Sequence, residues 1–146
     1  MTETKPTSDA EWLTRNSPEQ WIRQSLAELE RARGAFQARE ATAAIAHVKR
    51  AAGMALNGAL IVRPNERWGR KYMEHLRALG GSEDAPAEVR EAARRICEAR
   101  PPAGPVVTLR TRSEEERLLE AARTVMAHAY AIVHGSAGKS RVERET

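Results

Sequence analysis

The sequence predicts an all-α protein, folded as an up-and-down bundle of four to five helices. Ala, Leu, Glu and Arg dominate its 146 residues, and all four favour helices. Aromatic residues, which favour strands, are scarce, with three Trp, two Tyr and one Phe. In several long segments the apolar residues also recur at steps of three and four, the spacing that gathers side chains on one face of a helix.

The first main helix is expected from Pro18 to about Ala38, after a polar lead-in of residues 1–16 with one docked turn. Ser17 suits an N-cap, Pro18 fits the first helical position, and Gln20 lies where a capping box needs Glu or Gln. Its expected apolar face is Trp21, Ile22, Leu26, Leu29, Ala32 and Phe36.

Residues 41–62 are expected to form the central helix, in an antiparallel hairpin with the first. Its apolar face is Ile45, Val48, Ala52, Leu56 and Ala59. Most other positions are Ala or Gly, so partner helices have room to approach on several sides. Gly53 and Gly58 each cost about 0.8–1.0 kcal/mol relative to Ala in a helix interior, and close helix contacts are expected to compensate.

Three further helices follow. The first runs from about Glu66, after Pro64, to Leu79, and its buried stripe is Trp68, Tyr72, Leu76 and Leu79. The second follows Pro86 and carries Val89, Ala92, Ala93 and Ile96. Residues 100–112 form a long loop. The last helix is capped by Ser113, and its apolar seam runs from Leu118 to Val133. It is expected to end at the Gly135–Gly138 stretch, before a disordered tail at 136–146.

Composition favours one domain, residues 17–135, in a cytoplasmic protein. A single cysteine, Cys97, excludes an intrachain disulfide. No apolar run reaches the eighteen or so residues that a membrane span needs, and no stretch resembles a signal peptide. The 24 Lys and Arg exceed the 20 Asp and Glu by four. This excess permits a polyanionic partner without requiring one.

Residues 47–60, HVKRAAGMALNGAL, resemble the signature helix of HEPN domains (higher eukaryotes and prokaryotes nucleotide-binding), whose usual pattern is H-a-x-Q-A-A-E-K-A-L-K-A-L-L. The first helix is similar to the family's W-x4-A-x2-D-L-x2-A spacing, and residues 75–79, HLRAL, to its H-D-L-x-x-L. The resemblance spans roughly residues 20–134. The small and apolar positions match, whereas Arg50, Gly53, Met54 and Asn57 replace the usual Gln, Glu, Lys and Lys.

The resemblance implies a bundle of about five helices that forms a homodimer. HEPN proteins commonly act as toxin ribonucleases or as companions of small nucleotidyltransferases in toxin-antitoxin systems. Ribonuclease members carry an R-x4-H-x-Y motif, and Arg123, His128 and Tyr130 have that spacing. By resemblance, Arg123 would stabilise phosphorane charge, His128 would act as acid or base, and Tyr130 would be a modification site.

The geometry of an α-helix, in which each residue is rotated by about 100° around the axis, argues against such a site within one chain. Arg123 and His128, five residues apart, are separated by about 140° around the helix axis. They are expected to flank the apolar seam and to meet only across a dimer. In the alternative interpretation, Arg123 pairs with Glu120 and His128 and Tyr130 are surface residues.

A second candidate site binds nucleotide or RNA. Arg63, Arg67, Arg70 and Lys71 crowd Trp68 and Tyr72, and cations interleaved with aromatics suit phosphate contact and base stacking. His47 and Arg50 of the signature helix are added to this site. In the alternative, Trp68 and Tyr72 belong to the core, the cations form a solvated face, and His47 and His75 are hydrogen-bonded at helix contacts.

The sequence is therefore compatible with three functions. The first is a dimeric, non-catalytic module that binds nucleotide, RNA or a nucleotidyltransferase. The others are a metal-free toxin ribonuclease and a structural interaction protein. No His, Cys, Asp or Glu residues have metal-ligand spacing, and no glycine-rich phosphate loop occurs. Neither a metal nor a cofactor is predicted.

Overall fold

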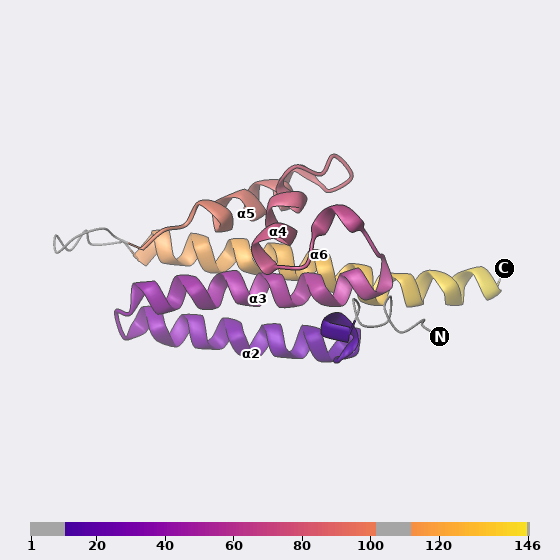
Figure 1. Cartoon of the computed structure of the whole chain (residues 1–146), viewed down its shortest axis with the longest axis horizontal. Coiled ribbons are helices and arrows are strands. Elements are labelled where there is room, and N and C mark those ends of the chain that lie inside the picture. Colours follow the sequence, from indigo (N-terminus) through magenta and orange to yellow (C-terminus); the bar gives the residue numbers. More distant parts are fainter. Residues whose placement is uncertain (1–10, 102–111, 146) are drawn as a thin grey trace, which may run out of the picture.

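The computed structural model describes residues 11–101 and the backbone of residues 112–145, with side chains from 113 to 135. Every regular element in these ranges is helical, so the predicted all-α class is confirmed. A helical turn at residues 11–14 precedes α2 (Pro18–Gln37), α3 (Ala41–Val62), the short 3-10 helix η1 (Glu66–Trp68), α4 (Tyr72–Gly80), α5 (Ala87–Glu98) and α6 (Arg112–Glu145). The helices α2, α3 and α6 are long rods lying side by side, and α4 and α5 cover one side of them (Figure 1).

The first hairpin forms as predicted. The Ser17 hydroxyl accepts a hydrogen bond from the Gln20 amide at 3.1 Å, and the Gln20 side chain accepts one from the Ser17 amide at 2.7 Å. This capping box starts α2 at Pro18, the first position at which proline costs no hydrogen bond. Residues 38–40 then turn the chain back into α3.

Helix α3 is the centre of the bundle, as its composition predicts. It packs against α2, α4, α5 and α6, and most of its length is buried. A Cβ atom at Gly58 would lie 2.9 Å from the Pro18 carbonyl oxygen, and one at Gly53 would overlap the Tyr72 side chain. Both glycines therefore mark close helix contacts, and Pro64 follows the end of α3 as expected.

The apolar face of α2 differs from the prediction at one position. Leu26 is 53% exposed, whereas Ser25 and Glu28 are buried against the rest of the bundle. Ser25 is small, and its buried hydroxyl donates a hydrogen bond to the Ile22 carbonyl oxygen at 2.7 Å. A buried serine at the helix contact keeps the neighbouring backbone close.

The predicted single helix from Glu66 to Leu79 is wrong, because it is two elements. Gly69 adopts a φ of 69°, a left-handed conformation that breaks the chain between η1 and α4. Trp68 ends the 3-10 turn and Tyr72 begins α4. Trp68, Leu76 and Leu79 are buried as predicted, while Tyr72 is only partly buried.

Helices α5 and α6 place their apolar seams in the core as predicted. Val89, Ala92, Ala93 and Ile96 of α5 are buried, and so are Leu118, Ala122, Val125, Ala129, Ile132 and Val133 of α6. The predicted end of α6 near Gly135 is wrong, since the helix continues to Glu145. Glycine weakens a helix without forbidding helical dihedral angles, and no proline follows to stop it. Most of the predicted loop, residues 102–111, lies outside the described residues.

Candidate functional site

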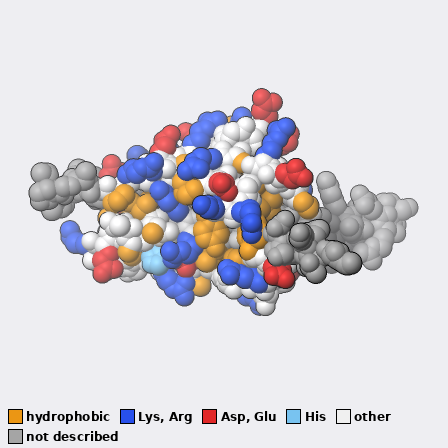
Figure 2. Space-filling model, viewed as in Figure 1, with side chains coloured by type: hydrophobic (Ala, Val, Ile, Leu, Met, Phe, Trp, Pro, Cys, Tyr) orange, Lys and Arg blue, Asp and Glu red, His pale blue; other side chains and the backbone are white. Residues whose placement is uncertain are grey.

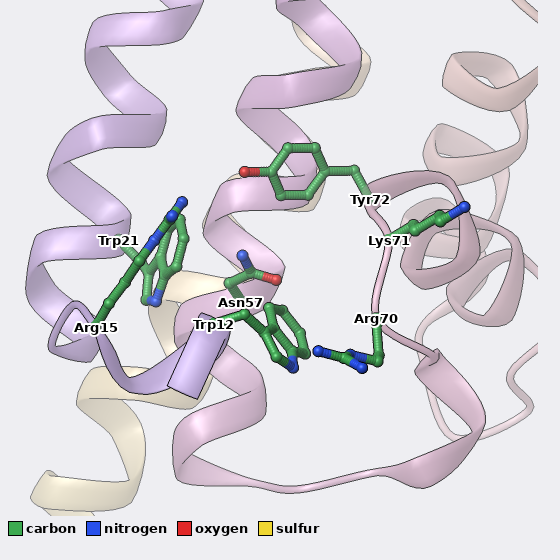
Figure 3. A pocket seen from close by; sticks show the side chains of 7 residues that line it. All are labelled: Trp12, Arg15, Trp21, Asn57, Arg70, Lys71 and Tyr72. Atoms are coloured by element: carbon green, nitrogen blue, oxygen red, sulfur yellow. The ribbon is translucent and has the colours of Figure 1, made fainter. Parts of the chain in front are cut away.

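A pocket of about 270 Å³ opens between the N-terminal turn, α2, α3 and the start of α4 (Figure 3). It combines three aromatic rings, three cations and one amide. Its lining residues are Trp12, Arg15, Trp21, Asn57, Arg70, Lys71 and Tyr72. Three of these, Arg70, Lys71 and Tyr72, come from the segment whose cations and aromatics alternate in the sequence.

The N-terminal turn is held over the pocket by Trp21. The buried Trp21 indole donates a hydrogen bond from Nε1 to the Leu13 carbonyl at 2.8 Å. Trp12 and Arg15 of this turn both line the pocket. The Arg15 guanidinium lies 5.3 Å from the Trp21 ring centroid, a cation–π contact that keeps its charge at the pocket.

The break at Gly69 positions the two cations on the opposite side. The Glu74 carboxylate accepts hydrogen bonds from the backbone amides of Arg70 at 2.8 Å and Lys71 at 3.0 Å. These bonds lower the pKa of Glu74 and fix the turn that starts α4. The Arg70 guanidinium lies 5.6 Å from the Trp12 ring centroid, so a second cation–π pair spans the pocket.

Asn57 forms the floor of the pocket. It is 1% exposed, yet its amide lies at the centre of the lining residues in Figure 3. Its oxygen Oδ1 is 2.8 Å from Nε2 of His75, a fully buried histidine whose Nδ1 is 2.7 Å from the Trp68 carbonyl oxygen. Burial lowers the pKa of His75, although the Trp68 hydrogen bond and the Glu74 charge oppose this effect.

The side chains of Arg15, Arg70 and Lys71 form no ion pair within the described part of the chain. Their charge is therefore not neutralised by a partnered carboxylate. On the face seen in Figure 2, Lys and Arg side chains gather around hydrophobic side chains near the middle of the molecule. Such a combination suits a ligand that carries both a negative group and a planar ring.

The other predicted nucleotide-binding residues lie elsewhere. His47 and Arg50 bind Glu28 of α2, with His47 Nδ1 at 2.5 Å and Arg50 Nη1 at 2.8 Å from its Oε2 atom. Burial acts to raise the pKa of the Glu28 carboxyl, but hydrogen bonds from His47, Arg50 and Arg31 outweigh it and lower the pKa. His47 and Arg50 thus help to fasten α2 to α3, as the alternative interpretation held for His47.

Arg63 and Arg67 do not line the pocket either. Arg63 caps the end of α3 and lies close enough to His128 to lower its pKa. Arg67 is exposed in η1, and its backbone amide donates to the Asn65 side chain at 2.9 Å.

The R-x4-H residues lie together in a second, open depression of about 400 Å³ between α5 and α6. Arg123 and His128 line it with Glu88, Glu120 and Thr124. One open depression thus includes both residues, and the expectation that they meet only across a dimer stays a prediction. The Arg123 side chain pairs with Glu120, as the alternative interpretation held, with Nη1 3.1 Å from Glu120 Oε1. Burial is the main cause that lowers the pKa of His128.

Tyr130 does not line this depression. It is 53% exposed, and its ring centroid is 4.2 Å from that of His134.

Comparison with known proteins decides the family. The family model described as "HEPN domain" matches residues 18–131, which is most of the chain. The chain belongs to the HEPN family. Searches of curated proteins and of solved structures found no match. The HEPN match starts after Trp12 and Arg15, so these two pocket residues lie outside the matched region.

Four pocket residues of this HEPN domain were missed by sequence reasoning: Trp12, Arg15, Trp21 and Asn57. Asn57 carried a signal, because an amide in the middle of an apolar, alanine-rich helix needs a buried partner. Trp12 and Arg15 carried none, since their positions depend on the hydrogen bond between Trp21 and Leu13.

Among the residues that the structure describes, no three His, Cys, Asp or Glu side chains converge in a way that would hold a metal ion. Within the same residues, no helix combines the length and the apolar character needed to cross a bilayer.

Proposed function

We propose that this HEPN domain is a homodimeric binding module that engages a nucleotide, or a nucleotide unit of RNA, in the pocket between the N-terminal turn, α3 and α4. One observation supports this most directly. Two aromatic–cation pairs, Trp12 with Arg70 and Trp21 with Arg15, border a pocket floored by a buried amide. Aromatic faces stack on bases and cations bind phosphate, while an amide hydrogen-bonds a base edge.

A pocket of this volume is at the small end of ligand sites, which begin at about 300 Å³. It therefore suits one base rather than a folded RNA. The cations are at its border, where a phosphate attached to that base would lie. A nucleotidyltransferase partner, suggested by the family, would have to bind another surface of the domain.

Binding of a fluorescent single-stranded RNA, followed by anisotropy at increasing salt, tests the proposal. Arg70→Ala/Lys71→Ala removes two pocket cations, and Arg94→Ala/Arg95→Ala on α5 is the control with the same change of charge. We expect the pocket variant alone to reduce the slope of log affinity against log salt, by about 0.7 for each lost phosphate contact. Equal losses in the two variants would place the RNA outside the pocket.

Stacking provides a second measurement. Trp12→Ala should weaken RNA binding by about 1–3 kcal/mol, the usual contribution of one base stacked on an aromatic ring. Unchanged affinity would exclude stacking on Trp12.

A metal-free ribonuclease is the second candidate function, because Arg123 and His128 line one depression within a single chain. The lowered pKa of His128 leaves the imidazole neutral at pH 7, the form that a general base requires. Arg123 would stabilise the charge on the phosphorane, after leaving Glu120. Tyr130 is exposed and would be open to modification by a transferase.

Growth after expression in bacteria distinguishes this candidate. A ribonuclease should arrest growth and cleave RNA in the presence of a chelator, whereas His128→Ala should do neither. His134→Ala, at an exposed position on the same helix, is the matched control. Normal growth of cells that express the wild-type chain would exclude the ribonuclease function and would be consistent with the binding module.

A further inference from the structure

The surroundings of the His75 ring determine which of its two nitrogens carries a proton. It is fully buried, and three aromatic rings, those of Trp12, Trp68 and Tyr72, lie with centroids 6.2 to 6.4 Å from its own. Its Nδ1 atom is 2.7 Å from the Trp68 carbonyl oxygen. A carbonyl oxygen only accepts hydrogen bonds, so Nδ1 carries a proton.

The two orientations of the Asn57 amide correspond to the two protonation states of His75. An amide oxygen at the 2.8 Å position beside Nε2 requires a second ring proton, and thus an imidazolium. An amide NH2 group in the same place donates to the bare Nε2 of the neutral ring. The two orientations have the same shape, so the hydrogen-bond network decides between them.

The surroundings of His75 favour the neutral ring. Among the residues that the structure describes, no carboxylate hydrogen-bonds to it, and burial among aromatic side chains removes the water that would stabilise a charge. Glu74, on the same helix, is the charged group that favours the imidazolium. Arg15 on the N-terminal segment, and Arg70 and Lys71 before α4, are the cations of the adjoining pocket and oppose it.

The structure places the Asn57 oxygen Oδ1 2.8 Å from Nε2. With His75 neutral, the amide takes the opposite orientation, in which the NH2 group donates to Nε2 and the carbonyl oxygen is directed into the pocket. The Asn57 side chain has no other hydrogen bond within the described residues, so in this orientation its oxygen is open to a donor from a ligand. A buried acceptor without a donor is costly, and a ligand that supplies the donor is favoured.

We infer that this pocket selects adenine and cytosine, whose amino groups are at C6 and C4, over the bases with a keto oxygen at those positions, because neutral His75 holds the Asn57 carbonyl towards the ligand. The inference rests on the proposed function and names its ligand class. The amino group donates to the Asn57 oxygen. A keto oxygen in the same place meets an oxygen instead and leaves both acceptors unpaired.

Two matched pairs of nucleoside monophosphates test the inference with the full chain. AMP and IMP differ in the amino or keto group at C6 and in the hydrogen that IMP carries on N1. CMP and UMP differ likewise at C4 and N3, so size and charge are nearly equal within each pair. By calorimetry at about pH 8, where His75 is neutral, we expect the amino member of each pair to bind about three- to tenfold more tightly, the effect of one hydrogen bond. Equal affinities, or tighter binding of IMP and UMP, would overturn the inference while leaving the proposed function intact. No binding by any of the four would overturn both.

His75 is a positioning residue in this scheme, so the pH dependence of the preference reports on it. As His75 becomes protonated the amide turns and offers its NH2 group to the pocket, so the AMP/IMP ratio should decrease as the pH falls below the ordinary histidine pKa of about 6.5. Phosphate titration is common to both nucleotides and cancels in the ratio. A ratio that stays constant would show that His75 does not set the orientation of Asn57.

A variant of similar side-chain size gives the last measurement. Asn57→Leu removes the acceptor, and both affinity ratios should approach one while phosphate contacts remain. Helix content from circular dichroism checks that the variant is folded. If the variant does not fold, the affinity ratios of the wild type and their pH dependence still test the inference. A folded variant that keeps the amino preference would contradict the role of Asn57.

Discussion

Gly53 determines how closely Tyr72 approaches the central helix. A Cβ atom at this position would overlap the first carbons of the Tyr72 side chain, which are near the backbone and have little freedom to move. Tyr72 in turn forms one wall of the pocket. A single hydrogen atom in place of a methyl group thus connects helix packing to the shape of the site.

Gly53→Ala should therefore destabilise the protein, although alanine is the better helix former. Overpacking of a close contact typically costs about 1–3 kcal/mol, which exceeds the gain of about 1 kcal/mol in helix propensity. Urea unfolding measures the difference. Gly34→Ala in α2 is the control, because a Cβ there meets nothing within 4 Å and should stabilise by up to about 1 kcal/mol. If both variants are stabilised, Tyr72 is not in contact with Gly53.

At the scale of elements, the long helices could be predicted because their signals are local. Ser17 and Gln20 form the capping box that the sequence indicates, and α3 has the predicted bounds. The break at Gly69 could not be found from apolar spacing, because Trp68 and Tyr72 fit one helical stripe across it. The positive φ of Gly69 and the backbone bonds to Glu74 that follow it are local and polar, so they leave the apolar spacing unchanged.

The candidate site was less predictable than the helices, because most of its contacts join residues that are far apart in the sequence. Arg70 and Lys71 stood out because cations and aromatics alternate within a few residues. His47 and Arg50 matched a family position, but their partner Glu28 is 19 and 22 residues away in the sequence. Arg123 and His128 line one open depression, although their positions are about 140° apart around the helix axis.

The junction of η1 and α4 should make stability depend on pH between about 5 and 7. Burial lowers the pKa of His75 below the value of about 6.5 expected in the unfolded chain. As pH falls below 6.5, the unfolded chain therefore binds a proton that the folded ring resists, and the free energy of unfolding decreases. His128, whose pKa is also lowered, acts in the same direction.

Urea titrations at several pH values measure this dependence. His75→Gln removes one titrating group, so the slope of unfolding free energy against pH should become shallower, whatever the variant's overall stability. Glu28 and Glu74 have lowered pKa values and affect stability only below about pH 4.5, outside this window. An unchanged slope in His75→Gln would mean that His75 titrates normally in the folded protein.

At the scale of the whole molecule, two large apolar side chains are exposed among those that the structure describes. Leu26 on α2 and Tyr130 on α6 are each 53% exposed, and these two helices pack against each other. Neither side chain is part of the buried core. Since HEPN domains often form dimers, a second copy of the chain is the partner that we expect to cover them.

Self-association measured by sedimentation should therefore respond to Leu26. Leu26→Lys removes an apolar contact whose burial is worth about 1.5–3 kcal/mol, so the dimer dissociation constant should rise at least about tenfold. Gln37→Lys, at an exposed position on the same helix, adds the same charge and should leave the constant unchanged. Tyr130→Ala should weaken the dimer as well if α2 and α6 contribute to one interface. Equal dissociation constants for Leu26→Lys and Gln37→Lys would move the interface away from α2, and the exposure of Leu26 would then be that of an ordinary surface residue.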